Sequence, residues 1–442
     1  MAGGIFTSQN KVRPGAYINF KATNRAGNGV NDRGIVTMPL ALSWGEEGKL
    51  IEIKNTDFIE GNLISMIGYN GHEIEVQLIR EAFKNAHTVI TYRLNKNGAK
   101  ATAAQDEFNI IAKYPGTVGN RISIQVKAKL KNIFEVNVLL DGKVLEKFEA
   151  ATVEELAKVN SKYVNFTGTG ALTAIAGLNL EGGEDGEVSD ENYSDYFKLI
   201  KSKRFDVMGL PLVESTEVKE QALVFVKNMR EERGRKVQVV LRDYTTANYE
   251  GVISIDQGYK TETEIIKQDG FVAYIAGLTA GSAINKSNTY AIIPGATEII
   301  NPKDDLEIEE GIKEGMLMLS YSDNGAVRIE TDINTLTSYS DSTNEDFSKN
   351  RVIRTLDNIH NVAKMKFEEE YIGKVSNNPD GRNVYKTDML KHLKDLEAME
   401  AISEVIAEDI IISQGDKVDS VVVGMNVKPL DSMEKLYMII NV

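Results

Sequence analysis

Apolar and polar residues alternate with two different periods along this chain, and the change of period divides it into parts. Between Gly34 and Leu94, short apolar runs such as IVTMPLALSW alternate with segments of helical spacing such as VQLIREAFKNA, which indicates mixed α and β structure. From residue 97 to about 180 the period is two, as in NRISIQVKAKL and FEVNVLLDG, and Asp141-Gly142 is a predicted hairpin turn. This second part is predicted to be a mainly β module.

An acidic, glycine-rich segment follows the β module. Its sequence, LNLEGGEDGEVSDENYSDY, predicts an exposed linker. Beyond it, the predicted strands FDVMGLPL, KVQVVLR and GVISI alternate with helices, including one from Thr216 to Arg233 and the apolar FVAYIAGLTAGSA. Strands that are joined by crossover helices are typical of a largely parallel α/β sheet.

The last part of the chain predicts two long helices and then two strands. The apolar stripe of the first helix consists of Ile353, Leu356, Ile359, Ala363 and Phe367. The stripe of the second helix consists of Leu390, Leu393, Leu396, Met399, Ile402 and Ile406. The strands are the two apolar runs of VDSVVVGMNVKPLDSMEKLYMIINV, with a turn between them. Near the other end, AYINFKA predicts a further strand after Pro14-Gly15.

The final run, KLYMIINV, is apolar at nearly every position after Lys435. A strand of this composition needs neighbours on both sides, because an exposed apolar edge would aggregate. Either the run completes the sheet of its own domain, or it is donated to a neighbouring molecule. The pattern leaves both alternatives open.

Composition and charge narrow the range of partners. A chain of 442 residues is expected to form roughly two to four domains at about 150 residues each. Lys and Arg number 51 against 65 Asp and Glu, and this net charge of −14 argues against nucleic acid and anionic lipid as partners. With no cysteine, there is no disulfide or thiolate site. The first thirty residues lack a signal-peptide pattern, and no stretch is apolar enough to span a membrane, so we expect folding in the cytoplasm.

Motifs for nucleotide chemistry are missing from the sequence. The Gly-Lys pairs are followed by Leu50, Val144 and Val375, whereas a Walker A loop needs Ser or Thr there. The glycine-rich TGTGALTAIAG lacks the third glycine of a dinucleotide-binding turn. We therefore expect no nucleotide cofactor.

The residue patterns of serine hydrolases and of metal sites are also missing from the sequence. A serine hydrolase needs a histidine base, and none of the four histidines accompanies a glycine-framed serine or has metal-ligand spacing. These histidines are His72, His87, His360 and His392, and we expect them to be structural or solvent-facing. The acidic clusters 184–187 and 304–310 lack the ligand pattern of an EF-hand and predict solvated loops. The sequence thus predicts a protein that is not an enzyme and binds no metal or cofactor.

Five further segments are distinctive when taken together in chain order. They are KVRPGAYINF, IIAKYPGTVGNRISIQV, AYIAGLTAGSAINKSNTY, INTLTSY followed by FSKNRVIRTLDNI, and MEKLYMIINV. These segments resemble the sheath proteins of contractile tails, in particular those of defective-prophage and myovirus-type tails of Gram-positive bacteria. The resemblance covers nearly the whole chain. It implies an α/β and α+β multidomain fold with a subtilisin-like α/β sheath core, an inserted mainly-β outer domain and extended terminal arms.

By position, the resemblance implies five parts, whose names follow the family. They are an N-terminal arm (1–21), the N-terminal part of the core (22–96), the inserted mainly-β outer domain (97–180), the subtilisin-like α/β domain (181–332), and the C-terminal domain with its arm (333–442). The protease name describes topology only, because the chain has no credible triad.

The function implied by the resemblance is structural. The chain is expected to polymerise as stacked hexameric rings around a tail tube, and contraction of this sheath would drive the tube through the host envelope. Its partners would be itself, the tail tube protein, the baseplate and the tail terminator, in a virion tail assembled in the host cytoplasm. The alternatives are a sheath of a tail-like bacteriocin or another contractile injection system and, more remotely, an α/β hydrolase-like enzyme.

Two sets of residues are candidates for assembly contacts. In the family, terminal arms add strands to the sheet of a neighbour, and here they correspond to about 11–21 and 435–442. The arm residues are Val12, Ala16, Tyr17, Ile18, Phe20, Leu436, Tyr437, Met438, Ile439, Ile440 and Val442. Charged residues off the apolar stripe of the helix TDMLKHLKDLEAMEAISE form the candidate tube-facing surface, and the alternative is an ordinary solvated helix face. These are Lys391, Lys394, Asp395 and Glu397.

Overall fold

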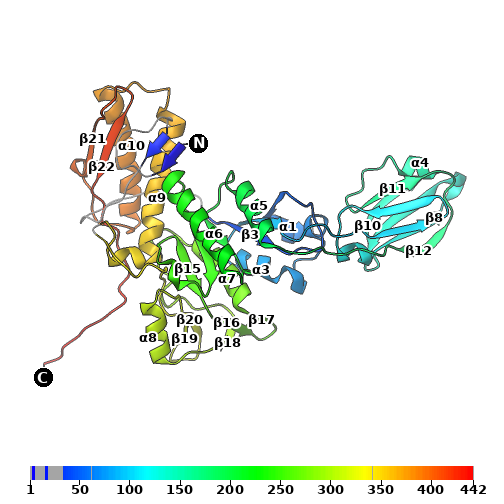
Figure 1. Cartoon of the computed structure of the whole chain (residues 1–442), viewed down its shortest axis with the longest axis horizontal. Coiled ribbons are helices and arrows are strands. Elements are labelled where there is room, and N and C mark those ends of the chain that lie inside the picture. Colours follow the sequence, from blue (N-terminus) through cyan, green and yellow to red (C-terminus); the bar gives the residue numbers. More distant parts are fainter. Residues whose placement is uncertain (1, 5–14, 18–32, 61, 341, 442) are drawn as a thin grey trace. The chain divides into compact units, whose positions relative to one another are not determined.

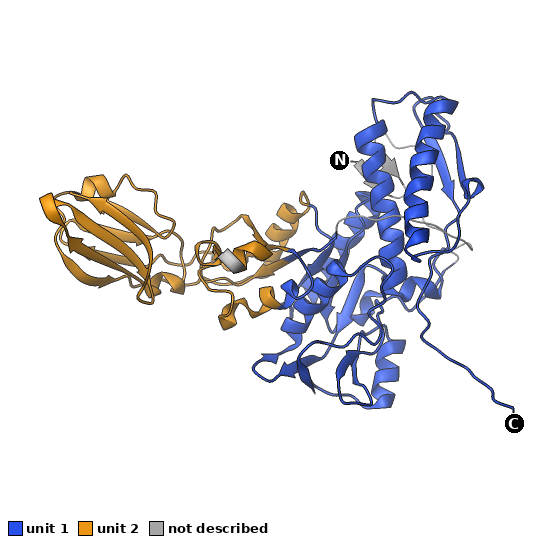
Figure 2. Cartoon of the chain, turned by 180° about the vertical axis from the view of Figure 1, so that it is seen from behind, with its two compact units in different colours: residues 1–37, 81–87, 204–442 blue, residues 38–80, 88–203 orange. Residues whose placement is uncertain are grey.

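The computed structural model describes residues 2–4, 15–17, 33–60, 62–340 and 342–441. The chain forms two compact units (Figure 2). Unit 1 comprises residues 1–37, 81–87 and 204–442, and unit 2 comprises residues 38–80 and 88–203. Each unit thus combines segments that are distant in the sequence. Of the predicted arm residues, Val12, Ile18, Phe20 and Val442 lie outside the described residues.

Unit 2 contains a β-sandwich, which confirms the period-two pattern. Its sheets have the strand orders β10-β9-β8-β12 and β11-β7-β6, and every pairing is antiparallel. The rings of Phe148 and Phe166, one from each sheet, lie 6.2 Å apart. The strands are β6 Thr102–Gln105, β7 Phe108–Ala112, β8 Ile122–Ala128, β9 Phe134–Leu140, β10 Lys143–Ala150, β11 Val164–Gly168 and β12 Ile175–Asn179, with the short helix α4 Val153–Leu156.

Alternation along the strands explains why the sandwich forms. In β8, Ile122, Ile124 and Val126 are buried between more exposed polar neighbours, as expected for a strand with one face toward a core. Asp141 and Gly142 both have positive φ angles, 48° and 79°, and connect β9 to β10 as the two-residue hairpin turn that the sequence predicts.

The rest of unit 2 is mixed α and β structure, again as predicted. The antiparallel pair β4 Leu50–Lys54 and β5 Thr88–Arg93 is accompanied by α1 Asn55–Glu60, α2 Leu63–Ile67 and α5 Asp190–Ile200. Helix α3 Gln77–Phe83 begins in unit 2 and ends in unit 1.

The acidic segment after the sandwich is mostly exposed, as its composition predicts, but polar contacts hold part of it in place. Gly183 is buried, and the Asp185 carboxylate accepts hydrogen bonds from Ser43 Oγ (2.9 Å) and from the Thr117 backbone N–H (2.7 Å). Arg93 donates to the Asp185 carbonyl oxygen at 3.1 Å. Polar contacts within unit 2 therefore fix the returning chain, although the glutamates around them are exposed.

Unit 1 contains the predicted parallel α/β sheet. Four strands of this sheet follow one another in the order β15-β14-β13-β3, all parallel. They are β3 Ile35–Leu40, of which residues 38–40 belong to unit 2, β13 Val207–Gly209, β14 Gln238–Arg242 and β15 Val252–Ile255. Helix α6 Thr216–Lys227 continues as a π-helical turn at Asn228–Glu232, and α7 Gln268–Gly281 packs against β13 and β14. Helix α7 is buried along almost its whole length, which explains its apolar sequence.

A smaller β region follows the parallel sheet in unit 1. It consists of β16 Gly258–Thr261, β17 Ile265–Ile266, β18 Ala296–Ile300, β19 Leu319–Tyr321, β20 Val327–Ile329 and helix α8 Asp305–Lys313. The acidic cluster 304–310, predicted to be a loop, instead begins this helix. Asp304 accepts a hydrogen bond from the Glu307 N–H, and the Glu307 carboxylate accepts one from the Asp304 N–H, both at 2.9 Å. This capping box, with carboxylates in the first turn, favours a helix.

The two long helices near the C-terminus are confirmed as α9 Asn350–Lys366 and α10 Pro379–Ala398, and β21 Ile410–Gln414 and β22 Val421–Met425 lie beside them (Figure 1). The short parallel strands β1 Ala2–Gly4 and β2 Gly15–Tyr17 pair with each other.

The predicted stripe of α10 is wrong at its end. The helix stops at Ala398 because Glu400 adopts a positive φ of 56°, so Met399, Ile402 and Ile406 lie beyond it.

The second C-terminal strand prediction is also wrong within the single chain. Residues 435–441 form no strand, and in both views the end of the chain runs away from the rest of unit 1 (Figures 1 and 2). A β-strand requires a hydrogen-bonded neighbour, and the described part of the chain supplies none here.

Candidate assembly site

The C-terminal segment has a fixed base. The Leu430 N–H donates to the Ala401 carbonyl oxygen at 3.0 Å, which holds the chain against the turn after α10. Four residues later, the Glu434 carboxylate accepts hydrogen bonds from Lys349 Nζ at 2.5 Å and from Thr289 Oγ1 at 2.7 Å. No local pattern in the sequence indicates this anchor, because its partners lie 85 and 145 residues away along the chain.

Beyond Glu434 the chain exposes consecutive large apolar side chains. Their exposed fractions range from 68% for Met438 to 88% for Tyr437. The set is Leu436, Tyr437, Met438, Ile439 and Ile440. A contiguous exposed apolar segment of this kind marks an interaction site or an aggregation hazard.

The N-terminal candidates are only partly described. Ala16 and Tyr17 lie in β2, whose backbone pairs in parallel with β1, so that Ala16 lies opposite Gly3 and Tyr17 opposite Gly4. The prediction of a strand at this position is confirmed for Gly15–Tyr17.

The hairpin of β21 and β22 forms a separate two-stranded sheet among the described strands. One face packs on the core formed by α9 and α10, with Ile410 buried and Ile412 and Val423 partly buried against it. Ile411, on the other face, is 64% exposed. Among the described strands, β21 and β22 pair only with each other, and an edge of this kind can accept a further strand.

The charged positions of α10 differ in the contacts that they make. Lys391, Lys394 and Asp395 are exposed, which fits both a tube-facing surface and an ordinary solvated helix face. Glu397 is instead used within the chain: it accepts from Lys394 Nζ at 2.6 Å and from the Val405 N–H at 3.0 Å. The hydrogen bond from Lys394 lowers the pKa of Glu397, and the contact with Val405 holds the chain after the helix.

Two of the four histidines, His360 and His392, are buried, and burial lowers the pKa of each. His360 Nε2 lies 3.2 Å from the Gly234 carbonyl oxygen, and burial holds its pKa well below the usual range. Burial likewise lowers the pKa of His392 to about 4. In the described ranges, no group of three or more His, Asp or Glu is placed to hold a metal ion, and no helix is long and apolar enough to cross a membrane.

Comparisons with known proteins cover the chain almost end to end. Residues 186–335 match the phage tail sheath protein central domain, and 342–442 match the phage tail sheath C-terminal domain. Residues 96–185 match the phage tail sheath β-sandwich domain, and 33–94 match the N-terminal region of domain III of the tail sheath protein Gp18. The chain belongs to the phage tail sheath family.

Individual relatives agree with this assignment. The sheath tail protein of Desulfitobacterium hafniense is 35% identical, with a TM-score of 0.82, over 96% of this chain and 99% of that protein. The phage-like element PBSX protein XkdK of Bacillus subtilis is 31% identical over 99% of each chain. The helical sheath of the anti-feeding prophage in its contracted state is 10% identical and shares the fold alone, with a TM-score of 0.56 over 99% of each chain.

The resemblance found in the sequence is thereby confirmed. The protein is a structural sheath protein of a contractile phage tail or a related tail-like particle, with a mixed α/β multidomain fold that includes a β-sandwich.

Proposed function

We propose that the chain polymerises as stacked hexameric rings around a tail tube, and that contraction of this polymer drives the tube through the host envelope. In this proposal the parallel sheet of unit 1 is the subtilisin-like core and acts as a scaffold without catalysis. The terminal segments are the arms that join subunits. Tube, baseplate and tail terminator are the other partners, and the tail assembles in the host cytoplasm.

The observation that carries the proposal is the exposed apolar segment 436–440 beyond a fixed base. Burying one Leu, Ile or Met side chain contributes about 1.5–3 kcal/mol, whereas ordering one residue costs about 1–2 kcal/mol. The free energy gained by burying the side chains is therefore only slightly larger than the free energy lost by ordering the chain. Main-chain hydrogen bonds to a neighbouring strand are needed in addition, and strand donation supplies both.

The acceptor in this proposal is an outer edge of the β21–β22 hairpin in a neighbouring subunit. That hairpin already rests one face on a helical core, so an added strand would extend an existing apolar surface. Alternate residues of the arm would then face the helices, and the intervening residues would face outward. An added strand would also cover a free edge that otherwise invites aggregation.

The test uses three variants in the full chain. Deletion of 436–442 removes the arm, and Met438→Pro removes one backbone N–H that would donate a hydrogen bond to the neighbouring strand. We expect each variant to fold as a subunit but not to polymerise. Met438→Leu keeps both the donor and the apolar character, and it should polymerise normally. Negative-stain electron microscopy and sedimentation measure the outcome. Sheaths of normal length from the deletion would refute strand donation.

A crosslinking experiment identifies the acceptor edge. Because the natural chain has no cysteine, the double variant Val422→Cys with Ile439→Cys introduces the only two thiols. We expect intermolecular disulfides in assembled polymer and none in dilute subunits. Efficient polymerisation without such crosslinks at any arm position would show that the arm binds elsewhere.

The exposed charges of α10, Lys391, Lys394 and Asp395, form the proposed tube-facing surface. Exposed ion pairs are weak, about 0.2–1 kcal/mol each, and need little shape matching. A contact of this kind holds subunits on the tube collectively and still lets them slip during contraction.

A further inference from the structure

Glu434 is the last described residue with a partner before the exposed segment. Its side chain is 14% exposed, and both carboxylate oxygens are used: Oε2 by Lys349 Nζ, and Oε1 by Thr289 Oγ1. Burial alone would raise the pKa of Glu434, but the hydrogen bonds from Lys349 and Thr289 outweigh it and lower the pKa. The anchored form is therefore the charged carboxylate.

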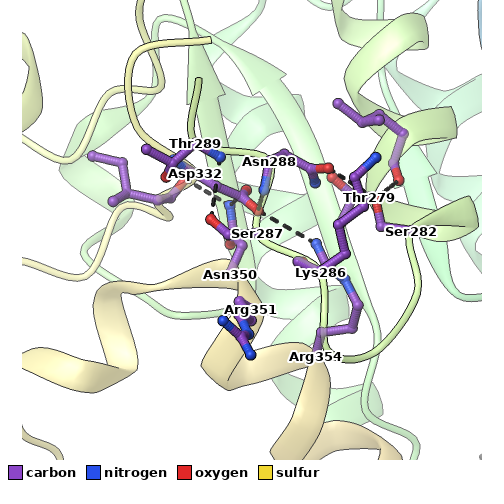
Figure 3. A network of polar contacts seen from close by, with 12 residues as sticks. Thr279, Ser282, Lys286, Ser287, Asn288, Thr289, Asp332, Asn350, Arg351 and Arg354 are labelled. Atoms are coloured by element: carbon purple, nitrogen blue, oxygen red, sulfur yellow. Dashed lines mark hydrogen bonds and ion pairs between the residues drawn. The ribbon is translucent and has the colours of Figure 1, made fainter. Parts of the chain in front are cut away.

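The anchor is attached to a buried polar network. Thr289 Oγ1, which donates to Glu434, accepts a hydrogen bond from the Asp332 N–H at 3.0 Å. The Asp332 carboxylate accepts from the Asn288 N–H at 3.0 Å and from Asn350 Nδ2 at 2.9 Å (Figure 3). Asp332 and Asn350 are almost fully buried. The side-chain oxygens and nitrogen of Asp332 and Asn350 all have hydrogen-bond partners, and buried groups that are satisfied in this way rigidify their surroundings.

The backbone conformation of Tyr290, the residue after Thr289, also indicates that this segment is rigid. Tyr290 has a φ of 57°, a left-handed conformation that an aromatic residue adopts only when its surroundings force it. Its N–H donates to the Ile329 carbonyl oxygen at 2.7 Å, and the Arg328 guanidinium lies 3.6 Å from the centre of its ring. The segment that holds Glu434 is thus fixed on both sides of Thr289.

We propose that Glu434 is the positioning residue of the C-terminal arm, which sets where the arm leaves the subunit and how far it can reach. This inference rests on the proposed strand donation. While Glu434 is bound, a single residue, Lys435, separates the anchor from the apolar segment. If Glu434 is released, the last fixed point becomes Leu430, and five residues, 431–435, separate it from that segment.

The longer tether has a calculable effect on assembly. The effective concentration of a tethered segment at its site falls roughly as the −3/2 power of tether length. A tether that is five times longer therefore lowers the effective concentration of the arm about tenfold. The added four residues also extend its reach by about 13 Å at 3.3 Å per residue, which lets it reach neighbours at the wrong spacing.

The first experiment compares critical concentrations for polymerisation by sedimentation. For Glu434→Ala we expect a critical concentration about tenfold above that of the natural chain, and polymers with variable ring spacing. Glu404→Ala is the matched control: it makes the same truncation and charge change at an exposed position, and it should leave the critical concentration unchanged. A critical concentration for Glu434→Ala within twofold of the control would overturn the inference.

The second experiment measures the arm base in unassembled subunits. Trypsin cleaves after Lys435 only when the flanking chain can extend into the protease, so the anchor at Glu434 should retard cleavage. We expect Glu434→Ala and Lys349→Met each to accelerate this cleavage, with no further gain in the double variant, since both break the same contact. Unchanged cleavage in both single variants would also overturn the inference.

The two proposals fail in distinguishable ways. If the deletion of 436–442 polymerises normally, strand donation is wrong, whatever Glu434 does. If the deletion blocks polymerisation while Glu434→Ala behaves like Glu404→Ala in both experiments, donation stands and the positioning role is wrong. An unchanged melting temperature for Glu434→Ala separates positioning from a general loss of stability.

Discussion

Acid should destabilise the C-terminal helical region through His392. This side chain lies in α10, is only 6% exposed, and its Nε2 has no hydrogen-bond partner in the described structure. Burial, with a smaller contribution from Lys366, lowers the pKa of His392 from 6.5 to about 4. The folded protein therefore keeps this ring neutral at pH values where the unfolded chain protonates it.

The sign and size of the effect follow from proton linkage. Between pH 6.5 and about 4 the unfolded state binds a proton at His392 that the folded state does not, so the free energy of unfolding falls as the pH falls through this window. Each tenfold change in proton affinity is worth about 1.4 kcal/mol. The full loss is therefore about 3 kcal/mol below pH 4, and more than half of it is present by pH 4.5.

The assay is urea unfolding of His392→Leu and the natural chain at pH 7.0 and 4.5, with hydrogen exchange in α10 peptides reporting the local transition. For each protein we compare the free energy of unfolding at pH 7.0 with that at pH 4.5. Taking this difference cancels any change in stability that leucine causes at neutral pH. We expect the variant to lose about 2 kcal/mol less on acidification. His72→Leu, at an exposed position, is the control and should behave like the natural chain. Equal acid losses for His392→Leu and the natural chain would refute the reasoning.

Two further predictions concern the tube contact and the core. Lys391→Glu with Lys394→Glu should reduce sheath assembly on isolated tubes in electron micrographs while leaving tube-free polymerisation unchanged, and normal assembly on tubes would contradict the α10 proposal. Gly277→Ala should destabilise unit 1 by about 2 kcal/mol in urea unfolding, although Ala normally favours helices, because its Cβ would lie 2.2 Å from the Ala82 carbonyl oxygen. Gly177→Ala, whose Cβ meets open space, is the control, and equal stabilities of the two variants would refute this argument.

Local patterns predicted the elements whose causes are local. The alternation in β8 and the three- and four-residue spacing in α9 are set by burial of one face, which the sequence displays directly. The predicted stripe of α10 extends too far because Ile402 continues the apolar spacing but reaches the core after the helix has ended, beyond the left-handed Glu400. Ile406, the last residue of the predicted stripe, is 51% exposed. Periodicity records which residues are buried and does not show where the helix stops.

Contacts between distant segments could not be predicted in the same way. Asp185 reads as one of several solvated carboxylates in an acidic run, yet Ser43 and Thr117 bind it. Glu434 lies just before the apolar run in the sequence, and its partners Lys349 and Thr289 come close to it only in the folded chain. The arm and tube-contact residues remain predictions, because their partners are other molecules.

The proposed polymer requires two opposite kinds of contact, and the proposal assigns them to different residues of the chain. Contacts between subunits must persist while the subunits move a long way. In the proposal, an apolar strand next to the Glu434 anchor meets this need. The main-chain hydrogen bonds of the donated strand are kept, and the short segment between anchor and strand rotates. Contact with the tube must give way, and the exposed charges of α10 meet that need, because each solvated pair is worth little alone. If the same surface served both purposes, strong enough binding to keep subunits joined would also lock them to the tube, and contraction would stall.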